Sequence, residues 1–224
     1  MRHGILFCVV AYLFFARPAL AEDFDESLLA FAINVHRTPV QSWSGVGIYL
    51  GKDLFITAAH VVGRAWWTRP KVVIAGQEYP TRVVKEGSLE GTDLTLLSVD
   101  EELLPMRLRL RRISLCTKPP WPGEQIVTVV PGETVRSYIL APHRIPVSAR
   151  RFSTVIANGV RTGNSGSGVF DVQQRCLLGI ISRKISVSEP RDGTGKSVSR
   201  DIAKYFVPAS EIAAFLPAEA KPLQ

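Results

Sequence analysis

Three short motifs in this sequence carry the residue types used in nucleophilic catalysis. The run GNSGSG contains Ser165 and puts it on a glycine-rich turn. Such a turn lets backbone N–H groups point at an oxygen that becomes negative during acyl transfer. The run TAAH ends at His60, and its small residues allow an imidazole to approach a neighbouring segment. The apolar run DLTLL begins at Asp93, and a buried carboxylate there can orient a histidine.

Each motif taken alone also has a purely structural interpretation. A Gly/Ser-rich stretch can be a flexible surface loop, a single histidine in apolar surroundings is usually packed, and an aspartate before a strand usually belongs to a turn. A metal site is not predicted, because His36 and His143 show no ligand spacing to His60. The three motifs do occur in one chain in the order His, Asp, Ser, which favours a joint catalytic role.

With these motifs the sequence resembles the trypsin-like (chymotrypsin-fold) serine protease family, in particular its bacterial secreted or periplasmic members. The runs TAAH, DLTLL and GNSGSG are similar to the family's boxes around the catalytic His, Asp and Ser. Their order is the chymotrypsin-type order, and the resemblance extends over about residues 46–216. It implies an all-β fold of two six-stranded antiparallel Greek-key β-barrels, with the active site between them and a short C-terminal helix.

The resemblance also implies roles for individual residues. His60, Asp93 and Ser165 would form the catalytic triad, and the backbone N–H groups of Gly163 and Ser165 would form the oxyanion hole. Ser182 matches the position that supports the triad aspartate and lines the substrate strand. No metal or organic cofactor is implied.

Specificity is expected to depend on the segment before the nucleophile. By the resemblance Gly159 lies at the floor of the primary pocket, and residues 150–163 contain no acidic residue. A buried substrate cation would lack a partner there, so cleavage after Lys or Arg is not expected to be preferred. Small apolar or acidic substrate residues are expected instead. Arg161, Arg183 and Lys184 lie on the expected wall and rim; they either point to solvent or turn inward and favour an acidic or polar residue.

The predicted function is that of an exported serine endopeptidase, which cleaves peptide or protein substrates through a covalent acyl-enzyme. An inert homologue that binds peptides or a partner protein is the main alternative, and an esterase with the same triad is another.

GTGKS at 193–197 is similar to the end of a phosphate-binding loop, but Pro190 replaces the opening glycine and a strand is expected to follow. Nucleotide binding is therefore not predicted. Nucleic-acid binding is not predicted either, because the net charge of +7 includes no basic cluster interleaved with aromatic residues. No prediction follows for the oligomeric state.

Short strands separated by Gly and Pro turns are expected to position these motifs. The N-terminal barrel is predicted within 22–105 and the C-terminal barrel, with the terminal helix, within 106–224. The strands expected in the first barrel are 31–36, 45–50, 53–57, 71–75, 81–85 and 94–99. Those expected in the second are 125–130, 135–140, 153–157, 168–171, 177–182 and 197–200. The alternating run MRLRLRR at 106–112 predicts a further strand with one wet face, and 208–216 predicts a helix with Ser210 as its N-cap and Pro217 as its stop.

The first 21 residues have the organisation of a signal peptide. A basic start precedes an apolar run at 5–16, and Arg17-Pro18 and the small-x-small signature ALA at 19–21 follow. The run is short for a membrane span, so cleavage after Ala21 and a secreted or periplasmic location are expected, without stable membrane insertion. A retained anchor is the alternative. Asn164 stands where digestive relatives carry an activating aspartate, so a chain beginning near Glu22 is expected to be active without a further cut.

Two cysteines, Cys116 and Cys176, remain after removal of that segment. An exported chain meets an oxidising compartment, so one disulfide between them is expected. Two separate buried thiols are the alternative.

Overall fold

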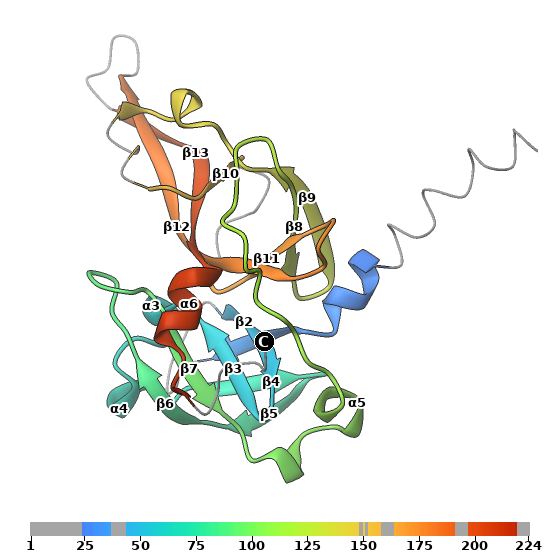
Figure 1. The fold of residues 1–224 in the computed structure, drawn as a ribbon. Helices are drawn as coiled ribbons and strands as arrows, with labels where there is room; N and C mark the ends of the chain where they lie inside the picture. Colours follow the sequence, from blue (N-terminus) through green and yellow to red (C-terminus); the bar gives the residue numbers. More distant parts are fainter. Residues whose placement is uncertain are drawn as a thin grey trace, which may run out of the picture.

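The computed structural model describes residues 24–36, 44–147, 150, 152–157, 164–190 and 197–218. Two antiparallel β-sheets dominate this part of the chain, and they lie one above the other in Figure 1. The fold class expected from the sequence is confirmed: the chain is mostly β, with two curled half-barrels and one C-terminal helix. Among the described residues, no helix is long and apolar enough to span a membrane.

The first sheet has seven strands in the order β5-β4-β1-β2-β3-β7-β6. Every pairing in it is antiparallel. The strands are β1 (Ala32–His36), β2 (Gly45–Gly51), β3 (Leu54–Thr57), β4 (Lys71–Ile74), β5 (Gln77–Pro80), β6 (Arg82–Glu86) and β7 (Thr95–Ser98).

Strand β5 is the one strand of this sheet that the sequence did not predict. Its residues QEYP include types that are depleted in strands. Ala75 and Gly76 precede it with φ of 50° and 83°, as in the two-residue hairpin turns that match strand twist. The turn therefore returns the chain to pair with β4, and the pairing outweighs the weak strand propensity.

The second sheet has six strands in the order β10-β13-β12-β11-β8-β9. They are β8 (Gln125–Val130), β9 (Glu133–Tyr138), β10 (Val155–Ala157), β11 (Gly168–Asp171), β12 (Leu177–Pro190) and β13 (Ser197–Pro208). Strand β13 continues well beyond the predicted end at residue 200, because it pairs with β12 along its whole length. The ladder supplies backbone partners that no local sequence pattern reports.

The short helices include α3 (Ala59–Val62), α4 (Ala65–Thr68), α5 (Met106–Arg109) and α6 (Ala209–Phe215), with 3-10 turns at Glu101–Leu103 and Pro142–Arg144. Helix α6, red in Figure 1, follows β13 directly and runs back over the first sheet. Lys85 Nζ donates a hydrogen bond of 2.8 Å to the carbonyl oxygen of Phe215 at the end of this helix. The predicted N-cap was wrong: Pro208 occupies the N-cap position, and no side chain caps the helix.

The strand predicted for 106–112 was also wrong. The segment forms α5 after Pro105, which is tolerated at a helix start. Leu108 is buried in the main core, whereas Leu110 is 77% exposed, so the Leu side chains do not line one buried face. Strand alternation stabilises a segment only where a sheet edge is available for pairing, and this segment has no strand partner among the described residues.

One large apolar cluster joins the two sheets. It includes Ile56 and Leu96 from the first sheet, Val127 and Ile180 from the second, and Ile212 from α6. Two smaller clusters belong to the second half of the chain alone. Burial of apolar area stabilises the folded chain at about 25 cal/mol per Å². The shared cluster therefore holds the two sheets in one relative position, which is a requirement for a site made from both.

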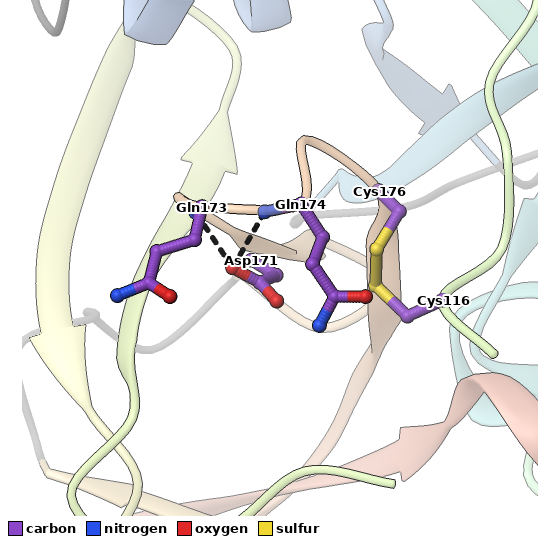
Figure 2. Close-up of a disulfide and its surroundings, with 5 residues drawn as sticks. All are labelled: Cys116, Asp171, Gln173, Gln174 and Cys176. Carbon is purple, nitrogen blue, oxygen red and sulfur yellow. Dashed lines mark hydrogen bonds between the residues drawn. A yellow bond between two sulfur atoms is a disulfide. The ribbon is translucent and has the colours of Figure 1, made fainter. Parts of the chain in front are cut away.

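The disulfide expected from the sequence is present between Cys116 and Cys176. It ties the segment before β8 to the turn between β11 and β12 (Figure 2). Asp171 shapes this turn, because its Oδ1 accepts hydrogen bonds of 2.7 Å and 3.0 Å from the backbone N–H groups of Gln173 and Gln174. The covalent link therefore closes a turn that hydrogen bonds already define.

Candidate active site

His60 and Asp93 form a hydrogen-bonded pair within the first half of the chain. His60 belongs to α3, which follows β3 directly, and Asp93 stands just before β7, the neighbour of β3 in the sheet. The Nδ1 atom of His60 lies 2.8 Å from Oδ2 of Asp93. The backbone N–H of His60 donates to Oδ1 of the same carboxylate at 3.0 Å. Both carboxylate oxygens therefore contact the histidine residue and fix its ring orientation.

A third hydrogen bond reaches Asp93 from the second sheet. The hydroxyl of Ser182 donates to Oδ2 of Asp93 at 2.5 Å. In the β12–β13 ladder Ile181 pairs with Phe206 and Arg183 with Tyr205, so Ser182 is an extra residue at a β-bulge. A bulge re-aims a side chain, and here it directs the Ser182 hydroxyl out of the ladder and onto the carboxylate.

The environment keeps Asp93 ionised although it is only 2% exposed. Burial acts to raise its pKa, but the hydrogen bonds from His60 and Ser182 stabilise the charged form. The net result is a pKa below the ordinary value for aspartate. An ionised carboxylate can only accept a hydrogen bond, so it favours the tautomer of His60 that carries the proton on Nδ1. The Nε2 atom is then free to act as a hydrogen-bond acceptor.

Ser165 lies on a turn that is tied to both sheets. Its carbonyl oxygen accepts a hydrogen bond of 2.9 Å from the N–H of Val46 in β2. The next residue, Gly166, donates its N–H to the carbonyl of Ile181 in β12 at 2.8 Å. Val46 also accepts a hydrogen bond of 2.6 Å from Thr57, which precedes the His60 helix. The turn of Ser165 thus rests on the same end of the first sheet that carries His60.

Gly166 is required by this arrangement. Its φ of 89° belongs to a region that side chains other than glycine rarely adopt. A Cβ atom at this position would lie 1.8 Å from the carbonyl oxygen of Val46 and 2.5 Å from Oγ1 of Thr57. The close approach of the two segments depends on the missing side chain.

A cavity of about 320 Å³ lies beside the candidate triad aspartate. Its lining residues are Glu90, Gly91, Asp93, Phe152, Arg183, Tyr205, Val207 and Glu211. Arg183 faces this cavity, and its buried Nε atom has no hydrogen-bond partner in the part of the chain that the structure describes. Lys184 behaves differently, because its exposed ammonium lies 3.4 Å from the carboxylate of Asp201. Of the expected wall and rim cations that the structure describes, Arg183 is therefore the one that lines the cavity.

Two residues expected at the site, Gly159 and Gly163, lie outside the described residues, as does Arg161. Other residues near the site were not anticipated. Tyr205, Glu90 and Glu211 line the cavity, and Lys204 is buried in β13. A lysine inside the apolar strand IAKYFVP was a detectable signal, because lysine is seldom buried without a partner.

A possible metal-binding group within the described ranges consists of Cys116, Asp171 and Cys176. Both sulfur atoms are joined in the disulfide, so neither is available as a thiolate ligand. The group therefore belongs to the structural turn of Figure 2 rather than to the candidate active site.

Solved structures with the same fold are proteases. The Rv3671c protease from M. tuberculosis in its active form is 17% identical with a TM-score of 0.61, and the match covers 92% of this chain and 88% of that chain. The serine endoprotease from Yersinia pestis is 18% identical with a TM-score of 0.58, over 87% of this chain and 64% of that one. A human astrovirus serine protease is 18% identical with a TM-score of 0.53, over 84% and 94%. At these identities the similarity establishes the fold, which is that of the trypsin-like serine proteases.

The family follows from the sequence itself. Residues 45–180 match the model of the trypsin-like peptidase domain. This match covers more than half of the chain, so the chain belongs to that family. A search of curated protein sequences found no match.

Proposed function

We propose that this chain is a serine endopeptidase in which Ser165 is the nucleophile, His60 the general base and Asp93 the residue that orients the base. The observation that carries the proposal is the buried Asp93 carboxylate, which contacts both Nδ1 and the backbone N–H of His60. Such a pair prepares an imidazole to accept a proton at Nε2. In this proposal, the proton comes from the hydroxyl of Ser165 on its glycine-rich turn.

The reaction then proceeds in two stages. His60 Nε2 takes the proton of the Ser165 hydroxyl while its oxygen attacks the peptide carbonyl carbon. The tetrahedral intermediate collapses, the C–N bond breaks, and the imidazolium returns the proton to the leaving amine. Water, deprotonated by the same imidazole, then attacks the acyl carbon; the C–O bond to Ser165 breaks, the imidazolium returns the proton to the Ser165 oxygen, and the acid product is released. We assign the oxyanion hole to the backbone N–H groups of Gly163 and Ser165, where one lost donor typically costs about 100- to 1000-fold in rate.

A fluorophosphonate probe tests the nucleophile directly. An activated serine reacts with the probe, so the wild-type chain is expected to be labelled at Ser165 and the Ser165→Ala variant is not. Absence of labelling in a folded wild-type chain would favour the alternative, an inert homologue that binds peptides. Matched peptide and ester substrates then separate an endopeptidase from an esterase, because only an endopeptidase turns over the peptide at an appreciable rate.

We further propose that the chain is exported and that its signal peptide is cleaved after Ala21. The Cys116–Cys176 disulfide supports an oxidising compartment. Mature residues 22–105 would form the barrel that carries the base, and 106–224 the barrel that carries the nucleophile. A purified chain that begins at Glu22 is expected to react with the probe without further cleavage, since Asn164 cannot form the activating ion pair of digestive relatives. Intact-mass measurement of exported protein tests the cleavage site, and a requirement for a second cut would contradict the proposal.

The substrates proposed are peptides or proteins without Lys or Arg as the preferred residue before the cleaved bond. Residues 150–163 offer no carboxylate to such a cation, and Arg183 places a positive charge beside the site. Profiling on a peptide library tests this, and cleavage predominantly after Lys or Arg would refute it.

A further inference from the structure

Lys204 is a buried cation near the candidate active site. It lies in the middle of β13, opposite Lys184 of β12 on one side and Ile156 of β10 on the other. The residue is only 5% exposed. Lysine is almost never buried to this degree unless its ammonium group is paired.

The face of the sheet that carries Lys204 has apolar neighbours on the β10 side and the charged Lys184 on the β12 side. Directly opposed residues in antiparallel strands share a face, so the side chain of Lys204 is on the face of Ile156. Phe206, two residues along β13, is on the same face by strand alternation. Ile156 and Phe206 are both completely buried and belong to one cluster in the second sheet. Tyr205 occupies the opposite face, where it lines the cavity beside Asp93.

No hydrogen bond or ion pair of the Lys204 ammonium lies within the described ranges. The pKa of Lys204 is lowered, chiefly by burial; the carboxylate of Asp201 acts to raise it, and the charge of Lys184 acts to lower it. Asp201 is engaged elsewhere, with the hydroxyl of Ser186 at 2.6 Å and the ammonium of Lys184 at 3.4 Å. Burying a cation without a close partner is costly, so this position favours an anionic guest.

The ladder places Lys204 close to the nucleophile turn. Gly166 donates its N–H to the carbonyl of Ile181, and Ile181 pairs directly with Phe206. Lys204 is two residues from Phe206, which corresponds to about 7 Å along the strand. The flexible lysine side chain and a substrate side chain together can span a distance of this order.

We propose that Lys204 is a specificity-determining residue whose ammonium binds the side-chain carboxylate of a substrate Glu or Asp immediately before the cleaved bond. The inference rests on the proposed endopeptidase function and names the substrate class of that site. The segment that leads to Ser165 contains no acidic residue between 150 and 163, so it supplies no competing carboxylate. An acidic substrate residue would therefore be the partner that the buried ammonium lacks.

Two peptides that differ only in Glu or Gln before the cleaved bond test the proposal. The wild-type kcat/KM ratio for Glu over Gln is expected to be about 10-fold or more, because a site built for a charged partner discriminates against its neutral analogue. In Lys204→Met the ratio falls to within about 2-fold, and Lys204→Arg retains a preference for Glu. The control Lys118→Met removes an exposed lysine outside the site and keeps the wild-type ratio. A wild-type ratio near one, or a ratio that survives Lys204→Met, would overturn the proposal.

A purely structural role for Lys204 gives a different result. If the Lys204 ammonium instead stabilised the fold through a partner within the chain, Lys204→Met would lower the thermal midpoint of unfolding, and the kcat/KM ratio for Glu over Gln would stay unchanged. Removal of an unpaired buried charge should instead leave the midpoint unchanged or raise it. Thermal unfolding of the variant therefore accompanies the kinetic measurement.

Peptide binding to the Ser165→Ala chain separates this inference from the proposed function. Tighter binding of the Glu peptide than of the Gln peptide, abolished by adding Lys204→Met, supports the cation site even if the wild-type chain is not labelled by the fluorophosphonate. Equal binding of the two peptides to Ser165→Ala would contradict the cation site even if labelling at Ser165 succeeds.

Discussion

The base and the nucleophile of the candidate site are held in different ways. His60 and Asp93 come from neighbouring parts of the first sheet, and they contact each other through two hydrogen bonds. Ser165 is held by backbone contacts instead, and its turn is closed by a hydrogen bond of 3.1 Å from the N–H of Ser167 to the carbonyl of Asn164. The turn is linked to β2 in the first sheet by one hydrogen bond, through Val46, and to β12 in the second by two hydrogen bonds with Ile181, one from the N–H of Gly166 and one to the carbonyl of Ser167.

The two sheets differ in a corresponding way. The strands around the base, β3 and β7, are almost entirely buried and pair with each other without a register shift, although each has one shift with its other neighbour. The long β12–β13 ladder has two shifts, one of which releases Ser182 toward Asp93, and the disulfide also lies in this half of the chain. The regular β3–β7 pair thus supports the base, whereas a register shift in the β12–β13 ladder positions the Ser182 side chain. The base pair is expected to tolerate perturbation of the contact between the sheets better than the nucleophile turn.

The largest expected effect is the loss of the nucleophile itself. Ser165→Ala should lower peptide turnover by about a million-fold and abolish fluorophosphonate labelling, because residues of a triad act as a unit. Circular dichroism and the thermal midpoint should stay close to the wild-type values. The double variant Ser165→Ala/His60→Ala is expected to be little slower than Ser165→Ala, and near-normal turnover by Ser165→Ala would exclude this serine as the nucleophile.

Gly166→Ala is the direct way to break the contact between the nucleophile turn and the first sheet. The new Cβ would collide with the carbonyl of Val46, so we expect a loss of more than about 3 kcal/mol in unfolding free energy, or displacement of the turn and loss of labelling. Gly132→Ala is the matched control, since Gly132 has the same φ of 89° but no atom within 4 Å of the new Cβ. It should cost about 1–2 kcal/mol and keep labelling. Equal costs for the two variants, measured by chemical denaturation, would mean that the contact with β2 has no special role.

Removal of the disulfide should sharpen the difference between the two sheets. The cysteines are 60 positions apart, and a loop of this size predicts a loss of roughly 4 kcal/mol in the double variant Cys116→Ser/Cys176→Ser. Hydrogen exchange should accelerate more in β11 and β12 than in β3 and β7, because the disulfide closes the turn between β11 and β12. Uniform acceleration in both sheets would show that they unfold as a single cooperative unit.

Ser182→Ala has the smallest expected effect and tests the side-chain hydrogen bond that joins the two sheets at Asp93. A hydrogen bond to a charged group contributes about 1.5–3 kcal/mol, so kcat/KM should fall by roughly 10- to 100-fold. Ser186→Ala, on the same strand but bonded to the exposed Asp201, should change kcat/KM by less than about 2-fold. A decrease of the same size in both variants would point to a general change in β12.

Ser182→Ala is also expected to change how the free energy of unfolding depends on pH. The pKa of Asp93 is lowered in the folded chain, so its ionised form contributes stability above the unfolded pKa, and this contribution is lost as the pH falls through the folded pKa. Ser182→Ala removes one cause of the lowering and moves the folded pKa back toward its usual value. The stability difference between wild type and variant should therefore shrink as the pH falls from about 5 to about 2. Denaturation at several pH values measures it, and a difference that does not change with pH would contradict the role of Ser182 at the carboxylate.

Much of the fold could be predicted from local patterns. Runs such as GVGIYLG in β2 and TLLS in β7 combine strand propensity with turns on both sides, and the structure has strands at both. The pairing of Cys116 with Cys176 followed from the cysteine count in a chain expected to be exported. These features depend on residue type and on neighbours in sequence, which a single sequence contains.

The remaining features required the tertiary structure, because they depend on which strand lies beside which. Strand β5 forms against its propensity since it pairs with β4, and the Arg/Leu run forms α5 without a strand partner among the described residues. The bulge at Ser182 sets the direction of the side chains that follow it, so that Arg183 lines the cavity and Lys184 points away from it. No local sequence pattern signals this bulge. The burial of Lys204 likewise depends on the neighbouring strands β10 and β12. Residue types and local patterns thus specify the chemical groups and the class of fold, whereas the long-range pairing of strands sets the direction in which those groups point.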